Sequence, residues 1–158
     1  MNKMIEKIIK KLTEENKTIS TMESCTGGGA ANAITNIPGA SKILNYSAVT
    51  YSNEYKIKMG VSKETIDKYS VYSKETAKDM AKAISEFAKS DYGIGITGKL
   101  GVSDPHNPEG ENDKVFICIY DRKKEIYHDL SVKVNSEDRK NDKREVLEAL
   151  FSYLEKHV

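Results

Sequence analysis

Residues 23–29 read Glu-Ser-Cys-Thr-Gly-Gly-Gly, so the nucleophilic side chains of Ser24 and Cys25 stand just before three adjacent glycines. A β-prone run precedes this segment and an alanine-rich run follows it, which predicts a strand, a glycine turn and a helix. Such a turn can bring several backbone N–H groups and the positive end of a helix dipole to one point. That arrangement suits an anion or a developing oxyanion, although a glycine turn at this place could also be purely structural.

The glycine turn matches neither of two common phosphate-binding motifs. It lacks a closing Gly-Lys-Ser/Thr, so the lysine that clamps phosphate in a P-loop is missing. Its glycines are adjacent rather than spaced as G-x-G-x-x-G, and no acidic residue closes a second strand about 20 residues later. The turn is therefore neither a P-loop nor a dinucleotide-binding fingerprint.

A second polar group, residues 51–56 (Tyr-Ser-Asn-Glu-Tyr-Lys), follows a predicted strand and opens a predicted helix. Side chains at such a point commonly line a crevice in α/β sheets. A serine nucleophile needs a base, and the sequence places no histidine to serve as one. A desolvated lysine can have its pKa lowered enough to act, so Lys56 is the predicted base for Ser24.

Metal sites and disulfides are not expected. His106, His128 and His157 are scattered and are interpreted as surface side chains. Cys25 and Cys118 are spaced neither as a disulfide scaffold nor as a zinc site, which fits a reducing cytoplasm. We expect no metal and no cofactor.

Length and composition indicate one globular domain over residues 1–158, with 38% hydrophobic and 31% charged residues. A net charge of +1 provides no field for a nucleic-acid backbone, and the basic run at 139–144 is interpreted as a solvated helix face. No stretch approaches the roughly 18 apolar residues of a membrane span, and the first residues do not resemble a signal peptide. We expect a cytoplasmic protein with no nucleic-acid or membrane partner.

The apolar periodicity predicts an α/β fold with three layers, in which helices cover both faces of a mixed, mainly parallel sheet. The predicted elements are a helix over 3–15, strands over 17–22 and 46–51, a helix from the glycine turn to before Pro38, a short helix ending at Gly60, helices opened by Ser62 and Ser73, a strand over 92–97, a loop over 98–113, an antiparallel hairpin of strands over 115–120 and 126–134, and a helix from near Ser136. The strands over 17–22, 46–51 and 92–97 are expected to be central.

Gly93 and Gly95 indicate either close backbone packing or approach to a ligand. Two helices have predicted core faces, namely Ala77, Met80, Ala81, Ile84, Phe87 and Ala88 in one, and Val146, Leu147, Leu150, Phe151 and Leu154 in the other.

Five segments carry a family resemblance over nearly the whole chain. They are 21–28 (Thr-Met-Glu-Ser-Cys-Thr-Gly-Gly), 36–41 (Asn-Ile-Pro-Gly-Ala-Ser), 49–56 (Val-Thr-Tyr-Ser-Asn-Glu-Tyr-Lys), 60–61 (Gly-Val) and 95–98 (Gly-Ile-Thr-Gly). In this order they resemble the CinA C-terminal domain, the nicotinamide-nucleotide amidohydrolase family. The molybdopterin-binding-like domain that often precedes it is not in this sequence, so the chain resembles the stand-alone form.

The resemblance implies hydrolysis of the carboxamide of nicotinamide mononucleotide to nicotinate mononucleotide and ammonia, a step of pyridine-nucleotide salvage. It implies a small-molecule nucleotide substrate, no metal or organic cofactor, and a homodimer. The family's catalytic serine, tyrosine and lysine fall on Ser24, Tyr51 and Lys56. Cys25 is the rival nucleophile, and it ranks second because the family pattern places the attack on the neighbouring serine. The predicted substrate-binding residues are Cys25, Thr26, Gly27, Gly28, Asn53, Thr97, Gly98 and Arg139.

Two segments depart from the family pattern. Family members usually continue Thr-Gly with Ile-Ala-Gly-Pro and return through Lys-Pro-Val-Gly-Thr-Val, whereas here residues 99–105 read Lys-Leu-Gly-Val-Ser-Asp-Pro and residues 112–115 read Asn-Asp-Lys-Val. The usual Gly-Asp-Arg followed by a second arginine appears as Glu137-Asp138-Arg139 and then Lys143. Arg139 remains a candidate phosphate contact, whereas Lys143 keeps the charge but lacks the planar guanidinium, so a weaker grip on phosphate is expected. We expect a loop over 99–114 that is mobile without ligand, and weak activity on nicotinamide mononucleotide through a high KM.

Two functions therefore remain open from the sequence. Ser24, Tyr51 and Lys56 favour an amidohydrolase. The altered loop favours a family member that has lost or changed the reaction and serves as a nucleotide-binding or regulatory module.

Overall fold

The computed structural model of the protein describes residues 1–101, 105–135 and 138–158. Its elements follow in the order α1 (Asn2–Glu14), β1 (Ile19–Glu23), α2 (Gly29–Thr35), the 3-10 helix η1 (Ala40–Lys42), β2 (Leu44–Val49), α3 (Asn53–Lys58), α4 (Lys63–Tyr69), α5 (Lys74–Ala88), β3 (Tyr92–Lys99), β4 (Lys114–Asp121), β5 (Ile126–Lys133) and α6 (Arg139–His157). Within the described ranges the strands form one sheet in the order β2-β1-β3-β4-β5. None of the helices in these ranges is both long enough and apolar enough to cross a membrane.

The sheet is mixed and mainly parallel, as predicted. β1 pairs in parallel with β2 on one side and with β3 on the other. β4 is antiparallel to β3 and to β5, so among the described strands β4 alone runs against the other four. The predicted C-terminal hairpin is β4 and β5.

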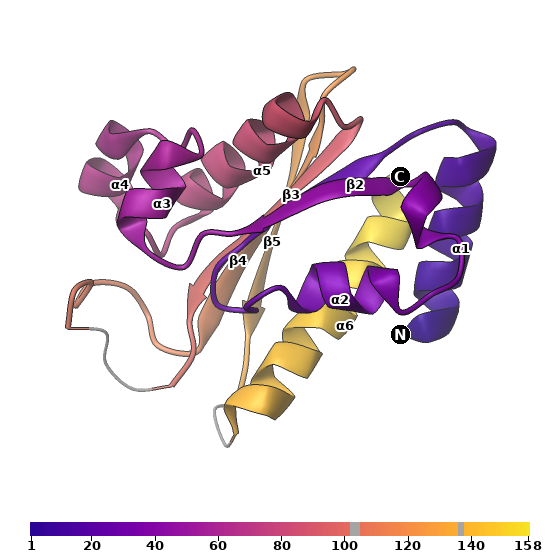
Figure 1. The fold of residues 1–158 in the computed structure, drawn as a ribbon. Coiled ribbons are helices and arrows are strands. Elements are labelled where there is room, and N and C mark those ends of the chain that lie inside the picture. Colours follow the sequence, from indigo (N-terminus) through magenta and orange to yellow (C-terminus); the bar gives the residue numbers. More distant parts are fainter. Residues whose placement is uncertain (102–104, 136–137) are drawn as a thin grey trace.

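Helices cover both faces of the sheet, which confirms the three-layer α/β architecture (Figure 1). α5 lies on one face with α3 and α4, and α1, α2 and α6 lie on the other. Side chains at alternate positions of a strand point to opposite faces of the sheet. Ile94 and Ile117 therefore share a core with α6, whereas Cys118 packs with Ala77 and Ala81 of α5.

The predicted central position of the strand over 46–51 is wrong. β2 spans Leu44–Val49 and forms an edge of the sheet, with partly exposed side chains along its length. β1 and β3 are buried at every position, and both lie inside the sheet with a strand on either side. An edge strand contacts the core from one side only, which accounts for its exposed residues.

Close backbone packing explains the two glycines of β3. A Cβ atom at Gly93 would lie 2.0 Å from the carbonyl oxygen of Ala81, and one at Gly95 would lie 2.2 Å from that of Ala77. Both carbonyls belong to α5, so these glycines let that helix approach the sheet closely. They do not mark a ligand contact.

Ser62 and Ser73 cap α4 and α5 as predicted, because their side chains accept hydrogen bonds from the amides of Thr65 and Thr76. The predicted core face of α5 is wrong at Phe87, which is exposed and whose ring lies 5.1 Å from that of Tyr46 on β2, and Ala88 is only partly buried. The apolar face predicted for α6 is buried throughout.

The predicted boundaries of the long loop and of the last helix both change. β3 continues to Lys99, which pairs with Lys114, so the loop is shorter than predicted. α6 begins at Arg139, because the side chain of Asp138 accepts a hydrogen bond from Lys140 and caps the helix. Its predicted start near Ser136, and Glu137 of the family comparison, lie outside the described residues, as do residues 102–104 of the loop.

Candidate active site

The candidate site lies at the carboxyl end of β1, where the connections between parallel strands switch from one face of the sheet to the other. The chain leaves β1 through α2 on one face to reach β2, and leaves β2 through α3, α4 and α5 on the other face to reach β3 (Figure 1). β1 therefore lies between two parallel neighbours whose connections cross opposite faces. In α/β sheets this switch point leaves a crevice that commonly binds ligands.

The backbone on both sides of β1 fixes Ser24. The Ser24 amide donates to the carbonyl of Ile96 on β3, over 3.0 Å, and the amide of Thr50 donates to the carbonyl of Glu23, over 2.8 Å. Gly27 and Gly28, which follow, have positive φ angles of 61° and 91°, a backbone conformation that glycine adopts readily. The two glycines let the chain turn from β1 directly into α2. Ser24 is the last residue before this turn whose amide bonds a neighbouring strand.

Glu23 supports this turn from inside, a role that the sequence analysis did not assign. Its carboxylate is 1% exposed and accepts hydrogen bonds from the amides of Ala30 and Ala31 and from the hydroxyls of Thr21 and Thr26, over 2.6–3.1 Å. The two amides belong to the first turn of α2, where a negative charge is favourable. Glu23 therefore ties β1, the glycine turn and α2 together.

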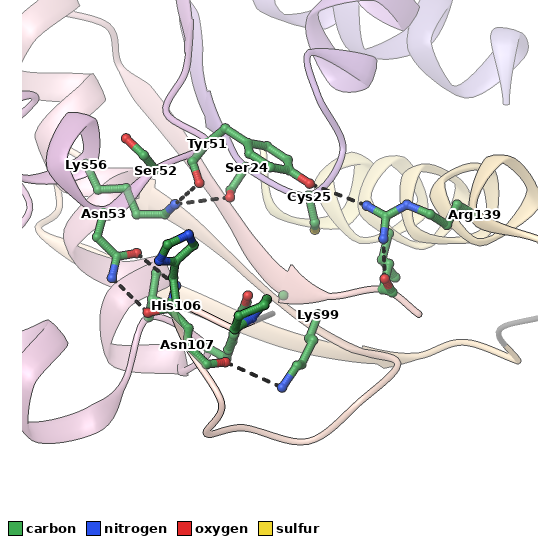
Figure 2. A pocket seen from close by; sticks show the side chains of 15 residues that line it. Ser24, Cys25, Tyr51, Ser52, Asn53, Lys56, Lys99, His106, Asn107 and Arg139 are labelled. Carbon is green, nitrogen blue, oxygen red and sulfur yellow. Dashed lines mark hydrogen bonds between the residues drawn. The ribbon is translucent and has the colours of Figure 1, made fainter. Parts of the chain in front are cut away.

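The structure brings Ser24 and Lys56 together, as the sequence predicts. Lys56 belongs to α3, and the side chain of Ser52 caps that helix by accepting from the amide of Tyr55. The Nζ atom of Lys56 lies 3.0 Å from the Oγ atom of Ser24, and the lysine is only 1% exposed (Figure 2). A hydroxyl and a buried amine at this distance form a nucleophile and base pair of the Ser-Lys type.

Main-chain carbonyls orient the lysine amine. Nζ of Lys56 donates to the carbonyl oxygen of Thr50 over 2.7 Å. It also donates to the carbonyl oxygen of Tyr51 over 3.2 Å (Figure 2). A protonated amine has three N–H groups, which these carbonyls and the Ser24 hydroxyl can accept. A neutral amine has two, so the two carbonyls take both and the nitrogen lone pair faces the Ser24 hydroxyl. The geometry thus suits removal of the Ser24 proton.

Cys25, the rival nucleophile, is held in its unreactive form. Burial raises the pKa of its thiol to about 12, and the nearby Lys56 ammonium offsets only part of that rise. The thiolate, which is the reactive species, is therefore scarce at neutral pH. The geometry favours Ser24 over Cys25.

Tyr51 contacts Lys56 through its main chain and Arg139 through its side chain. Its side chain is 64% exposed, and its hydroxyl accepts a 3.5 Å contact from Nη2 of Arg139 (Figure 2). The same guanidinium donates through Nη1 to the carbonyl of Leu100. The contact between Tyr51 and Lys56 runs through the main-chain carbonyl, whereas the phenol extends toward Arg139.

These side chains surround one cavity of about 580 Å³, within the usual size range of small-molecule sites. Its walls include Ser24, Lys56 and Arg139 together with Lys99, the last residue of β3. None of the described residues that line it is acidic. The cavity is therefore cationic and suits a ligand that carries negative charge.

Comparison with known proteins now decides the family. A model of the CinA C-terminal domain matches residues 1–158. The chain belongs to the CinA C-terminal domain family.

Relatives of this CinA domain are longer proteins. A competence-damage inducible protein of Caldanaerobacter subterraneus subsp. tengcongensis is 49% identical over 110 residues, which are 68% of this chain and 27% of that protein. One from Clostridium kluyveri is 44% identical over 121 residues, 76% of this chain and 29% of that protein. The chain thus spans less than a third of the length of these relatives.

Solved structures share the fold of this CinA domain. The competence/damage inducible protein CihA from Agrobacterium tumefaciens matches with a TM-score of 0.87 at 25% identity, over 97% of this chain and 92% of that one. A competence or damage-inducible protein from Enterobacter asburiae matches with a TM-score of 0.90 at 22% identity, over 99% of this chain and 96% of that one.

Seven of the residues predicted for the site line the cavity of this CinA domain. They are Ser24, Cys25, Tyr51, Asn53, Lys56, Gly98 and Arg139. Thr26, Gly27, Gly28 and Thr97 do not line it. Thr26 donates to Glu23, and the hydroxyl of Thr97 donates to the carbonyl of Val71 over 2.8 Å, so both side chains serve the local structure. Lys143, the expected partner of Arg139, has its Nζ 3.5 Å from where a Cβ of Gly27 would lie.

Several amides of the glycine turn and of the start of α2 already donate hydrogen bonds, which leaves fewer amides for the predicted oxyanion site. They are the amides of Ser24, Gly27 and Gly29 in the turn and of Ala30 and Ala31 in α2. Within the described part of the chain, the amides of Cys25, Thr26 and Gly28 bond no carbonyl or carboxylate oxygen. These are the turn amides that an oxyanion could use.

His106 is an exposed side chain, as predicted, but it also lines the cavity, which the sequence did not indicate (Figure 2). It lies in the loop that departs from the family pattern, so no motif pointed to it. The adjacent Asn107 exchanges hydrogen bonds with Asn53, the closer over 2.8 Å, and so links this loop to the first residue of α3. His128 and His157 lie elsewhere, with ring centroids 4.4 Å apart.

Lys99 is another cavity residue that was not predicted from the sequence. The available signal was a lysine two residues after the predicted strand over 92–97, at a position where family members usually have isoleucine. Across residues 1–101, 105–135 and 138–158, no three His, Cys, Asp or Glu side chains gather in a way that could hold a metal ion.

Proposed function

We propose that this CinA domain hydrolyses the carboxamide of nicotinamide mononucleotide to nicotinate mononucleotide and ammonia. The observation that carries the proposal is the 3.0 Å contact between Ser24 Oγ and a buried Lys56 Nζ. The cationic cavity around this pair supports it, because the substrate carries a phosphate. Family membership supports the general class of reaction.

In the first half of the proposed reaction, Ser24 Oγ attacks the amide carbon while Lys56 Nζ takes the hydroxyl proton. The negative charge that forms on the amide oxygen is stabilised by two of the three amides that remain available in the glycine turn, those of Cys25 and Thr26. The C–N bond then breaks, and Lys56 returns the proton to the departing nitrogen, which leaves as ammonia. The product of this half is an ester on Ser24.

In the second half, a water molecule attacks the ester carbon and gives a proton to Lys56. The ester bond breaks, Lys56 returns the proton to Ser24, and nicotinate mononucleotide leaves. Tyr51 contributes its carbonyl, which holds one N–H of Lys56 through both halves. Its hydroxyl, together with Arg139, is assigned to the substrate end of the cavity.

The decisive experiment measures ammonia release from nicotinamide mononucleotide by the purified protein. Ser24→Ala and Lys56→Met should each reduce kcat by about a thousandfold or more, because each deletes half of the pair. Cys25→Ala is the matched control, since it changes the adjacent buried residue and should retain most activity. Turnover that survives Ser24→Ala but not Cys25→Ala would reverse the assignment of the nucleophile.

A second function, a nucleotide-binding or regulatory module without turnover, is favoured by the altered residues 99–114. Calorimetry separates the two functions: binding of nicotinamide mononucleotide without ammonia release would support the module. A homodimer and a cytoplasmic location remain proposals that follow from the family resemblance alone.

A further inference from the structure

Lys99 is a buried cation with no carboxylate partner among the described residues. It is only 7% exposed and lies in the wall of the cavity (Figure 2). Its Nζ lies 3.4–3.5 Å from the carbonyl oxygens of Asn107, Pro108 and Glu109, and 5.5 Å from the centroid of the Tyr72 ring. Among the described residues, no carboxylate lies within salt-bridge distance of it.

These contacts do not replace the water that Lys99 gives up on burial. Hydrogen bonds from nitrogen to oxygen are usually 2.7–3.2 Å long, so all three carbonyl contacts are at the weak end. An ammonium over an aromatic ring gains only a modest stabilisation. A buried charge is costly unless it is paired, so this ammonium would gain from an anion that entered the cavity.

The other cations of the cavity are placed differently. Lys56 is committed to Ser24 and two carbonyls. Arg139 is exposed, so water already solvates its guanidinium. Lys99 is therefore the cation of the cavity that has most to gain from an anionic ligand.

We propose that Lys99 binds the phosphate monoester of the substrate and sets the preference of the site for phosphorylated ligands. The identity of the nucleotide rests on the proposed function, but the phosphate subsite itself does not. The ammonium exchanges its three long carbonyl contacts for charge-assisted hydrogen bonds to phosphate oxygens. In this chain a side chain thus supplies part of the grip that a glycine-rich backbone was expected to supply.

The test uses two pairs of ligands that differ only in phosphate. Binding of ribose 5-phosphate and of ribose is measured by calorimetry, and kcat/KM is measured for nicotinamide mononucleotide and nicotinamide riboside. Lys99→Met keeps the apolar stem and removes the charge. Lys58→Met is the matched control, because Lys58 carries the same charge on an exposed part of α3 outside the cavity lining. Thermal unfolding confirms that each variant is folded.

The Lys99→Met variant should bind ribose 5-phosphate about tenfold or more weakly than the native chain, whereas Lys58→Met should not. Its preference for nicotinamide mononucleotide over the riboside should fall by a similar factor, through KM rather than kcat, and Lys99→Arg should restore part of it. Ribose 5-phosphate binding that depends on Lys99 without any amide hydrolysis would retain the subsite and refute the proposed function. Hydrolysis with an unchanged preference in Lys99→Met, or no ribose 5-phosphate binding by the native chain, would overturn the subsite.

Discussion

Replacing Glu23 by glutamine should destabilise the fold by an amount that the structure allows one to work out. All four groups that contact the carboxylate donate hydrogen bonds, two to each oxygen, and each oxygen receives one backbone amide of α2. A glutamine presents an NH₂ group on one side, so whichever way it turns, one of those amides faces a donor. The threonine hydroxyls can rotate, but the amides cannot.

A buried donor left without an acceptor costs about 1–3 kcal/mol, and loss of the negative charge beside the start of α2 adds about 0.3–1 kcal/mol. We therefore expect Glu23→Gln to lower the free energy of unfolding by about 1–4 kcal/mol. Urea unfolding followed by circular dichroism measures it, and a midpoint shift of about 0.5–2 M corresponds to this loss.

Glu86→Gln provides the control, because Glu86 is exposed and its 3.8 Å ion pair with Lys82 is a surface contact worth little. A loss below about 0.5 kcal/mol in Glu23→Gln, equal to that of the control, would refute the view that this carboxylate holds the turn.

Three further outcomes are expected. Burial raises the pKa of the Cys25 and Cys118 thiols, so iodoacetamide at pH 8 should modify neither thiol in the folded protein and both in urea; rapid modification of Cys25 in the folded state would contradict this. Burial, and then the neighbouring His157, lowers the pKa of His128 below 6.5, so the unfolded chain binds this proton more readily than the folded chain. The contribution of neutral His128 to stability is therefore complete above pH 6.5 and falls as the pH drops toward the folded pKa. His128→Phe should flatten this pH dependence when unfolding is measured from about pH 5 to 7.5. Gly95→Ala should reduce soluble expression or the melting temperature sharply, since its Cβ would overlap a carbonyl of α5; a native melting temperature would show that the helix can move away.

Periodicity and turn chemistry were sufficient to predict most of the fold. The apolar stripe of α6 and the serine caps of α4 and α5 are local signals, and each was found where it was predicted. The edge position of β2 could not be predicted in this way. Strand order depends on which neighbours pair, and the alternation within Leu44–Val49 does not contain that information.

The Ser24 and Lys56 pair was predictable because each residue lies in a motif and their chemistry is complementary. Glu23, Lys99 and His106 were not, for different reasons. A glutamate in a turn is usually solvated, and only the fold shows that four donors converge on it. The other two act through the cavity, whose walls come from segments far apart in the sequence.

The two main-chain carbonyls that hold the Lys56 amine have a consequence for how this site can evolve. The amine rests on the carbonyls of Thr50 and Tyr51, and every amino acid has a carbonyl. Replacing either side chain leaves both carbonyl acceptors in place, so few single substitutions at these two positions could remove the hydrogen bonds to Lys56. An insertion or deletion between β2 and α3 would displace both acceptors at once. The orientation of Lys56 should therefore survive substitutions at positions 50 and 51 far better than a change in the spacing between β2 and α3, even where a substitution at 51 weakens substrate binding. A graft of the Ser24 and Lys56 pair onto another scaffold must copy the backbone path of this segment.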